Sequence, residues 1–159
     1  MAQSRLEKAG SPTGLRRLMF RAPIGLYRLR LGFVLGRRFL MLEHRGRKTG
    51  ITRRTVLEVV ANDRDTLYVA AAWGERAHWL RNIVVDPNVR IYWGVRRFDT
   101  VAARIETERA RSVLSGYAGA HPRTFSRLAR FMLDDPGDGI EESVNHLAAT
   151  VPMVALPKH

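Results

Sequence analysis

The chain has 159 residues, of which 45% are hydrophobic and 26% charged, a balance typical of one soluble globular domain. It has no cysteine, which excludes disulfides, thiolate metal ligands and a cysteine nucleophile. The net charge of +12 lies entirely in residues 1–54, because residues 55–159 carry equal numbers of basic and acidic side chains. Such a local excess indicates one anion-binding site or one membrane-facing surface, rather than a uniformly basic nucleic-acid-binding protein.

A basic helical segment is predicted at residues 1–36. Ser11 and Pro12 are typical of a helix start, and Pro23 ends this helix before a second short one. Over residues 12–38 the arginines interrupt every apolar run before it reaches the length that spans a membrane. The segment therefore predicts either a helix packed on the domain or a helix lying on an anionic membrane surface. No secretory signal is recognised.

Short strands and helices are predicted to follow in a mixed order. Strands are expected at residues 39–44, 53–61, 66–72, 89–93, 97–105 and 151–156. Helices are expected at residues 76–85, 107–117, 121–132 and 140–149. Short turns join consecutive strands, which favours antiparallel pairing. We therefore expect a single α+β domain over residues 1–159, a small closed or split β-barrel, mainly antiparallel, with flanking helices.

The turn between the first two strands, residues 44–54, is the most distinctive stretch of the chain. Five of its side chains are cationic, and Gly46 and Gly50 bracket the tightest cluster. Glycine permits a tight turn, and cations with backbone N–H groups suit a phosphate or a carboxylate. The spacing is not that of a P-loop. The alternative interpretation is a solvated basic hairpin.

The usual signatures of hydrolytic and metal-dependent enzymes are not found. The five histidines lack the spacing of a zinc peptidase, and no serine lies in a Gly-x-Ser-x-Gly elbow. No Gly-x-Gly-x-x-Gly motif follows a strand, so a Rossmann dinucleotide site is not indicated. A chain without these groups but with an anion-binding turn is typical of proteins that bind a redox cofactor with a phosphate tail.

The motifs resemble those of the deazaflavin-dependent nitroreductase family of actinobacteria. Gly46-Arg47-Lys48-Thr49-Gly50, followed by Arg53, is similar to its Gly-Arg-Lys-Ser/Thr-Gly-x-x-Arg signature. Residues 69–74, 79–83 and 86–89 agree with three further family motifs in order and spacing, and residues 151–154 with its closing strand. The resemblance covers about residues 38–105 well and the ends loosely.

The resemblance implies an FMN-binding-like split barrel that binds the deazaflavin coenzyme F420. The reduced coenzyme would transfer a hydride to a quinone, a nitroaromatic or another unsaturated acceptor. The residues that the resemblance assigns to the coenzyme are Arg47, Lys48, Thr49, Gly50, Arg53, Arg54, Ala72, Trp73, Gly74, Trp79 and Asn82. The arginines and the lysine would hold the phosphate and the oligoglutamate tail, while backbone N–H groups of residues 72–74 would reach the ring or phosphate. FMN is the second cofactor considered.

The acceptor site is predicted less directly. This chain has Ala72-Trp73-Gly74-Glu75 where the family loop often has Ser-Lys-Gly-Gly, and its segment 117–139 is longer than in the best-known members. Tyr117 and His121 are the predicted proton donors to a reduced acceptor. The alternative is that they are a helix-surface residue and a helix cap, just as Trp79 has the alternative of a core tryptophan.

Other functions remain open at this level. One is a split barrel that holds a flavin, a haem or a lipid without turnover, and another is an oxidase that uses FMN. A nucleic-acid-binding protein is a third, although no recognised module is present. We expect a cytoplasmic protein without a nucleic-acid partner, with a peripheral location on the inner face of the cell membrane and a homodimer as further expectations.

Overall fold

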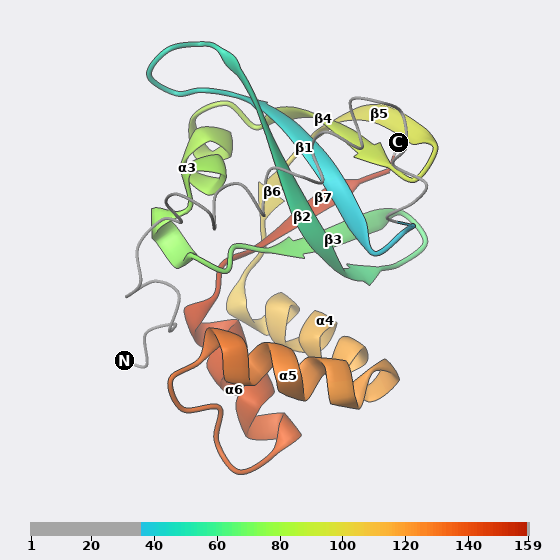
Figure 1. Ribbon diagram of the computed structural model, residues 1–159, viewed down its shortest axis with the longest axis vertical. Coiled ribbons are helices and arrows are strands. Elements are labelled where there is room, and N and C mark those ends of the chain that lie inside the picture. The colour runs from blue at the N-terminus through green and yellow to red at the C-terminus, as the bar shows by residue number, and fades with distance from the viewer. Residues whose placement is uncertain (1–35, 159) are drawn as a thin grey trace.

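The computed structural model describes residues 36–158, so the helices predicted before residue 36 lie outside the described residues. The described strands are β1 Phe39–Arg45, β2 Thr52–Asn62, β3 Thr66–Ala70, β4 Asn88–Trp93, β5 Arg96–Val101, β6 Ala103–Arg104 and β7 Met153–Pro157. The described α-helices are α3 His78–Val85, α4 Thr107–Ala120, α5 Pro122–Met132 and α6 Ile140–Thr150 (Figure 1).

The strands form an antiparallel sheet in the order β5-β4-β1-β2-β3-β7-β6, which curls into a barrel. β2 pairs with β1 through its first part and with β3 through its last part. β5 and β6 are separated only by Ala102, yet β5 pairs with β4 whereas β6 pairs with β7. One bent segment thus joins the two ends of the sheet. The predicted α+β split barrel is confirmed.

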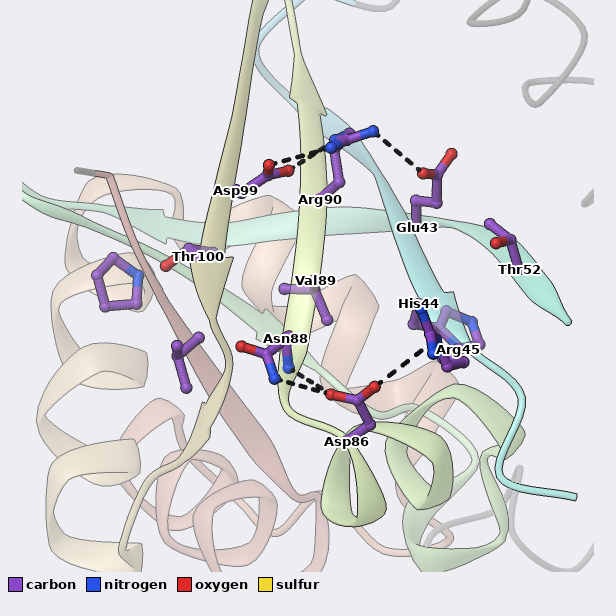
Figure 2. A pocket seen from close by; sticks show the side chains of 12 residues that line it. Glu43, His44, Arg45, Thr52, Asp86, Asn88, Val89, Arg90, Asp99 and Thr100 are labelled. Atoms are coloured by element: carbon purple, nitrogen blue, oxygen red, sulfur yellow. Dashed lines mark hydrogen bonds and ion pairs between the residues drawn. The ribbon is translucent and has the colours of Figure 1, made fainter. Parts of the chain in front are cut away.

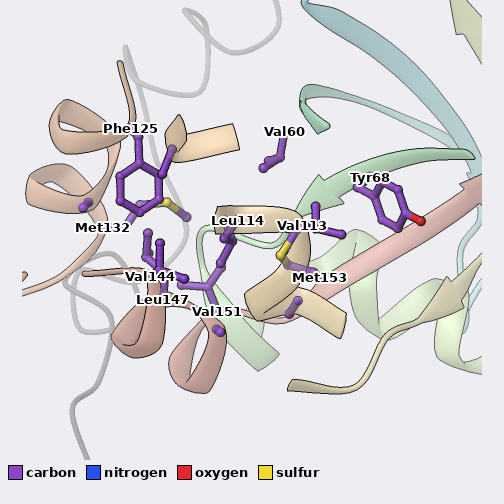
Figure 3. Close-up of a cluster of buried hydrophobic side chains, with 14 of the residues drawn as sticks. Val60, Tyr68, Val113, Leu114, Phe125, Met132, Val144, Leu147, Val151 and Met153 are labelled. Atoms are coloured by element: carbon purple, nitrogen blue, oxygen red, sulfur yellow. The ribbon is translucent and has the colours of Figure 1, made fainter. Parts of the chain in front are cut away.

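Two hydrophobic clusters hold the fold together. The first fills the barrel with inward-facing side chains such as Leu40, Leu42 and Ile91, and α3 closes one side of it with Leu80. The second lies between the sheet and the helices α4, α5 and α6, which pack together below the barrel (Figure 1). Figure 3 shows this helical cluster, which includes the fully buried ring of Phe125.

Most predicted elements have the expected type, with bounds that differ by a few residues, as in α4, which extends to Ala120, and two strands differ more clearly. The strand predicted at residues 66–72 ends at Ala70, because Gly74 takes a φ of +58° and its N–H donates to the carbonyl of Ala71 at 2.7 Å. The strand predicted at residues 97–105 is divided at Ala102, whose N–H donates to the carbonyl of Pro87. Within residues 36–158, no helix is both long and apolar enough to cross a bilayer.

Candidate functional site

The basic turn between β1 and β2 is closed by its own backbone. Gly46 N–H donates to the carbonyl of Ile51 at 2.9 Å, and Gly50 N–H donates to the carbonyl of Gly46 at 2.7 Å. Gly50 has a φ of +65°, which only glycine adopts easily. A Cβ on Gly46 would approach Thr49 Oγ1 to 3.0 Å and the Ile51 carbonyl to 3.2 Å. The turn therefore favours glycine at position 50 through its backbone conformation and leaves little room for a side chain at position 46.

These internal bonds correct one expectation about the turn. The N–H groups of Gly46 and Gly50 bind backbone carbonyls, and Ile51 N–H points to Thr49 Oγ1 at 3.4 Å. These three N–H groups therefore shape the turn and are not free donors for an anion.

Asn82 of α3 connects the turn to the body of the protein. Its Oδ1 accepts hydrogen bonds from the backbone N–H of Arg47 at 3.2 Å and from Arg47 Nη1 at 2.8 Å. Its Nδ2 lies 3.1 Å from Nδ1 of His44, at the end of β1. Asn82 and His44 are both buried. The nearby Trp79 is also buried, among the barrel core residues, so its side chain packs as a core tryptophan.

His44 is neutral in this environment. Burial lowers the pKa of its imidazole from 6.5 to about 4, and a hydrogen bond with the backbone of Arg45 opposes this effect. The positive charge of Arg53 lowers the pKa further, because the two residues are paired in the β1–β2 register. Sequence analysis did not select His44. The alternation Leu40, Leu42, His44 was the available signal that this side chain faces inward.

The register of β1 and β2 places the adjacent residues Arg53 and Arg54 on opposite faces of the sheet. Arg53 pairs with His44, whereas Arg54 pairs with Glu43, and side chains of neighbouring residues in a strand point to opposite faces. Arg54 Nη2 lies 2.8 Å from Glu43 Oε2. Within residues 36–158, the side chains of Arg53 and Lys48 have no ion-pair or hydrogen-bond partner. Both charges of the turn are therefore open to an anionic ligand.

The face that holds Arg54 carries a row of alternating charges across four strands. Arg54 of β2, Glu43 of β1, Arg90 of β4 and Asp99 of β5 follow one another in register. Arg90 Nε lies 2.6 Å from Asp99 Oδ1, and Arg90 Nη1 lies 3.8 Å from Glu43 Oε1. Figure 2 shows the last three side chains above a cavity of about 720 Å³. Each charge in the row already has a protein partner.

The segment Ala72–Gly74 forms a tight turn after β3. The N–H of Gly74, which the resemblance directs to the coenzyme, donates to the carbonyl of Ala71 in this structure. The ring of Trp73 packs against both hydrophobic clusters at the junction of the barrel and the helices. Ala72 is half-buried beside it.

Tyr117 and His121 lie together in a second cavity, of about 740 Å³, between β2 and α4. Their ring centroids are 5.4 Å apart, and the Tyr117 ring meets the edge of Phe125 at 6.4 Å. Burial raises the pKa of the Tyr117 hydroxyl, and the negative charge of Glu58 raises it further, against the opposing charge of Arg38. The phenol is therefore protonated at neutral pH.

Several other polar groups of this cavity bind one another. Arg38 Nε lies 3.1 Å from Glu58 Oε1. Tyr68 donates its hydroxyl to Asp63 at 3.0 Å and accepts a hydrogen bond from Arg109 at 2.7 Å. By contrast, the Tyr117 hydroxyl has no hydrogen-bond partner in the described part of the chain. It is a neutral donor that this cavity offers to a ligand, beside the hydroxyls of Ser112 and Thr124.

The turn and the second cavity lie towards opposite ends of β2. Arg53 is near the start of this strand, whereas the cavity is lined by its last residues, from Glu58 to Asn62. At about 3.3 Å per residue, five to nine residues correspond to roughly 16–30 Å. The structure therefore does not bring Tyr117 and His121 into contact with the basic turn, and only an extended ligand could reach both.

A family model provides the strongest comparison. The model described as F420H2-dependent quinone reductase matches residues 25–123, which is more than half of the chain. A comparison with curated protein sequences found no significant match.

Solved structures match the fold at low sequence identity. A structure described as the F420-H2 dependent reductase FDR-A has a TM-score of 0.52 and 18% identity, over 76% of this chain and 94% of that one. A structure described as a domain-swapped dimer has a TM-score of 0.54 and 16% identity, over 84% and 98%. HutZ, the heme storage protein from Vibrio cholerae, has a TM-score of 0.51 and 18% identity, over 84% and 91%. At such identities these structures support the barrel and not a ligand.

Proposed function

The chain belongs to the F420H2-dependent quinone reductase family, and on this premise we propose how it holds its coenzyme and what it reduces. The coenzyme is the deazaflavin F420, and the activity is a reduction that depends on its reduced form. We propose that the acceptor is a quinone, with nitroaromatics as further substrates. The observation that carries the assignment is the pair of unpartnered cations, Lys48 and Arg53, on a turn that α3 holds in place.

The basic turn fits the anionic part of the coenzyme. Its phosphate and oligoglutamate tail carry several negative charges, and charge-assisted hydrogen bonds to arginine and lysine are strong. Lys48 and Arg53 can bind these charges directly. Arg47 can add the guanidinium N–H groups that Asn82 does not use. Arg54 is omitted from this binding set because Glu43 neutralises it on the opposite face.

The cavity between β2 and α4 is the proposed acceptor site. The bound reduced coenzyme supplies a hydride, and a quinone that accepts it also needs a proton. Tyr117 can hydrogen-bond an acceptor oxygen and donate this proton, because its pKa is raised and its hydroxyl lacks a protein partner within residues 36–158. His121, 5.4 Å away between ring centroids, can return a proton to Tyr117 from the solvent, since it is exposed. The separation of the turn from this cavity suits an extended coenzyme with a charged tail and a reactive ring.

A fluorescence titration with oxidised F420, with FMN and haemin in parallel, tests the assignment. Binding of F420 alone, followed by turnover of a quinone with reduced F420, would support it. Preference for FMN would move the protein to the oxidase-like alternative. Binding of haemin without turnover would favour a storage function.

Membrane attachment and pairing are proposed separately. We propose that residues 1–36 form a basic helical segment of the single domain and bring residues 12–38 to an anionic membrane surface, where a lipid quinone would be accessible. A variant lacking residues 1–35 should then lose binding to phosphatidylglycerol vesicles that the full chain retains. A homodimer is a further proposal, supported only by the frequent pairing of split barrels, and sedimentation velocity tests it.

A further inference from the structure

We propose that His44 is a positioning residue, which acts through Asn82 to hold Arg47 in the orientation that binds the anionic tail of the coenzyme. The proposal rests on the proposed function of the basic turn. It begins from three residues in a chain of hydrogen bonds, from His44 of β1 through Asn82 of α3 to Arg47 of the turn, of which His44 and Asn82 are buried.

The donors of Arg47 determine the orientation of the Asn82 amide. Both groups that Arg47 presents are donors, a backbone N–H and Nη1, and arginine has no acceptor. The amide oxygen must therefore face Arg47, and the amide nitrogen must face His44. Since the Asn82 Nδ2 group is a donor 3.1 Å from His44 Nδ1, this ring nitrogen must be the acceptor. The geometry thus requires a neutral imidazole with its proton on Nε2.

A protonated His44 cannot take part in this chain. It would place an Nδ1–H donor against the amide nitrogen, and a rotated amide would place its nitrogen against the donors of Arg47. The surroundings also disfavour a charged imidazole, because the ring is buried and Arg53 of β2 is positive, and these effects outweigh the hydrogen bond with the backbone of Arg45; α3 contributes only the uncharged amide of Asn82. His44 therefore fixes the amide, and the amide fixes Arg47.

The chain of bonds leaves Arg47 able to bind a ligand. Asn82 takes one of the five guanidinium N–H groups, through Nη1, so the others remain for a phosphate or carboxylate. Without His44 as acceptor, the buried amide nitrogen would lose its partner, and the amide would be free to rotate away from Arg47. Anion binding would then require Arg47 to be ordered again by the ligand.

Two variants of His44 separate positioning from packing. In His44→Asn, the amide oxygen is two bonds from Cβ, as Nδ1 is in histidine. The variant therefore keeps a hydrogen-bond acceptor but fills less volume. His44→Leu fills the buried site better and removes the acceptor. Positioning predicts that His44→Asn binds F420 within about threefold of the wild type and that His44→Leu binds about tenfold more weakly, the loss expected for one hydrogen bond. Packing predicts the reverse order.

Three comparisons complete the test. The loss of affinity in His44→Leu should be absent when the ligand is the phosphate-free deazaflavin riboside. It should also be absent when Arg47 has already been replaced by alanine. If His44→Leu fails to fold, Asn82→Ala should show the same loss of F420 affinity. ¹⁵N NMR of the wild type should show an unprotonated Nδ1 and a protonated Nε2 at neutral pH. An equal loss with the riboside, an additive loss with Arg47→Ala, or a protonated Nδ1 would each overturn the inference.

The same variants distinguish failure of the inference from failure of the proposed function. If the wild type binds neither F420 nor the riboside, the proposed function fails. Hydrogen exchange of the Arg47 backbone N–H then tests whether His44 positions Arg47. Faster exchange in His44→Leu than in His44→Asn would support it, and equal exchange would overturn it. If the wild type binds F420 and the His44 variants do not differ, the function stands and the inference fails.

Discussion

Glu43 and Arg54 face each other across the β1–β2 ladder, with 2.8 Å between the carboxylate and the guanidinium. The next pair in the register, His44 and Arg53, lies on the opposite face, next to α3. Two consecutive arginines therefore have different tasks. Arg54 belongs to a row of compensated charges, and Arg53 lies on the face of α3, with its charge open to the ligand that we propose for the turn.

The first prediction compares these two arginines. Arg53→Ala should weaken F420 binding by roughly 1–3 kcal/mol, because it removes a charge-assisted contact to the tail. Arg54→Ala should leave F420 binding unchanged and cost less than about 1 kcal/mol of stability, since its ion pair with Glu43 is partly exposed. Fluorescence titration and urea denaturation of both variants provide the measurements. Equal losses of binding would contradict the separation of the two faces.

The second prediction concerns the shape of the turn. Gly50→Ala should destabilise the protein by about 1–2 kcal/mol, because alanine is strained at a φ of +65°. It should also weaken F420 binding, since the turn carries the cations. Gly119→Ala in α4 is the matched control, with open space around a new Cβ, and should raise stability by about 0.5–1 kcal/mol. Thermal unfolding of both variants would reveal the opposite signs.

The third prediction is the pH dependence of stability. The folded pKa of His44, about 4, lies below its value of 6.5 in the unfolded chain. Between these pKa values the unfolded state binds more protons than the folded state. The contribution of neutral His44 to the free energy of unfolding is therefore fully present above pH 6.5 and is lost as the pH falls towards 4. The pKa difference corresponds to a loss of about 3 kcal/mol in the free energy of unfolding.

Urea denaturation at several pH values from 4.5 to 7 checks the pH dependence. The wild type should lose stability through this range, and His44→Asn should lose less, because asparagine does not titrate. The pKa values of the Asp86 and Asp99 carboxyls are lowered, mainly by hydrogen bonds to Asn88 and Arg90 respectively, so these groups titrate below this window. Equal losses of stability with pH in the wild type and His44→Asn would show that His44 does not cause the pH dependence.

The fourth prediction tests the acceptor site. Tyr117→Phe should lower kcat for quinone reduction by roughly 100-fold, the lower end of the usual contribution of a general acid, without changing F420 affinity. Tyr92→Phe is the matched control, because Tyr92 lies on β4, outside the cavity. Steady-state kinetics with reduced F420 would reveal the difference. An unchanged kcat in Tyr117→Phe would mean that solvent supplies the proton.

Local patterns in the sequence were sufficient to predict much of the fold. Strand β1 and helix α6 have nearly the predicted bounds, because alternation and helical spacing reflect which side chains each element buries. The turn at Gly46 and Gly50 was likewise predictable, since tight turns depend on a few neighbouring residues. The closure of the barrel was not, because a single strand was predicted where Ala102 divides β5 from β6 and redirects the pairing.

The composition of the site was determined by the sequence itself, and its arrangement by the tertiary structure. The clustered cations and the glycines between them specify an anion-binding turn from nearest-neighbour chemistry alone. Which cations face the ligand depends on the register with β1, and the order of the turn depends on Asn82, which is 35 residues from Arg47 in the chain. His44 has a role only because folding brings it against that amide. Such contacts join residues distant in sequence, so no local pattern encodes them.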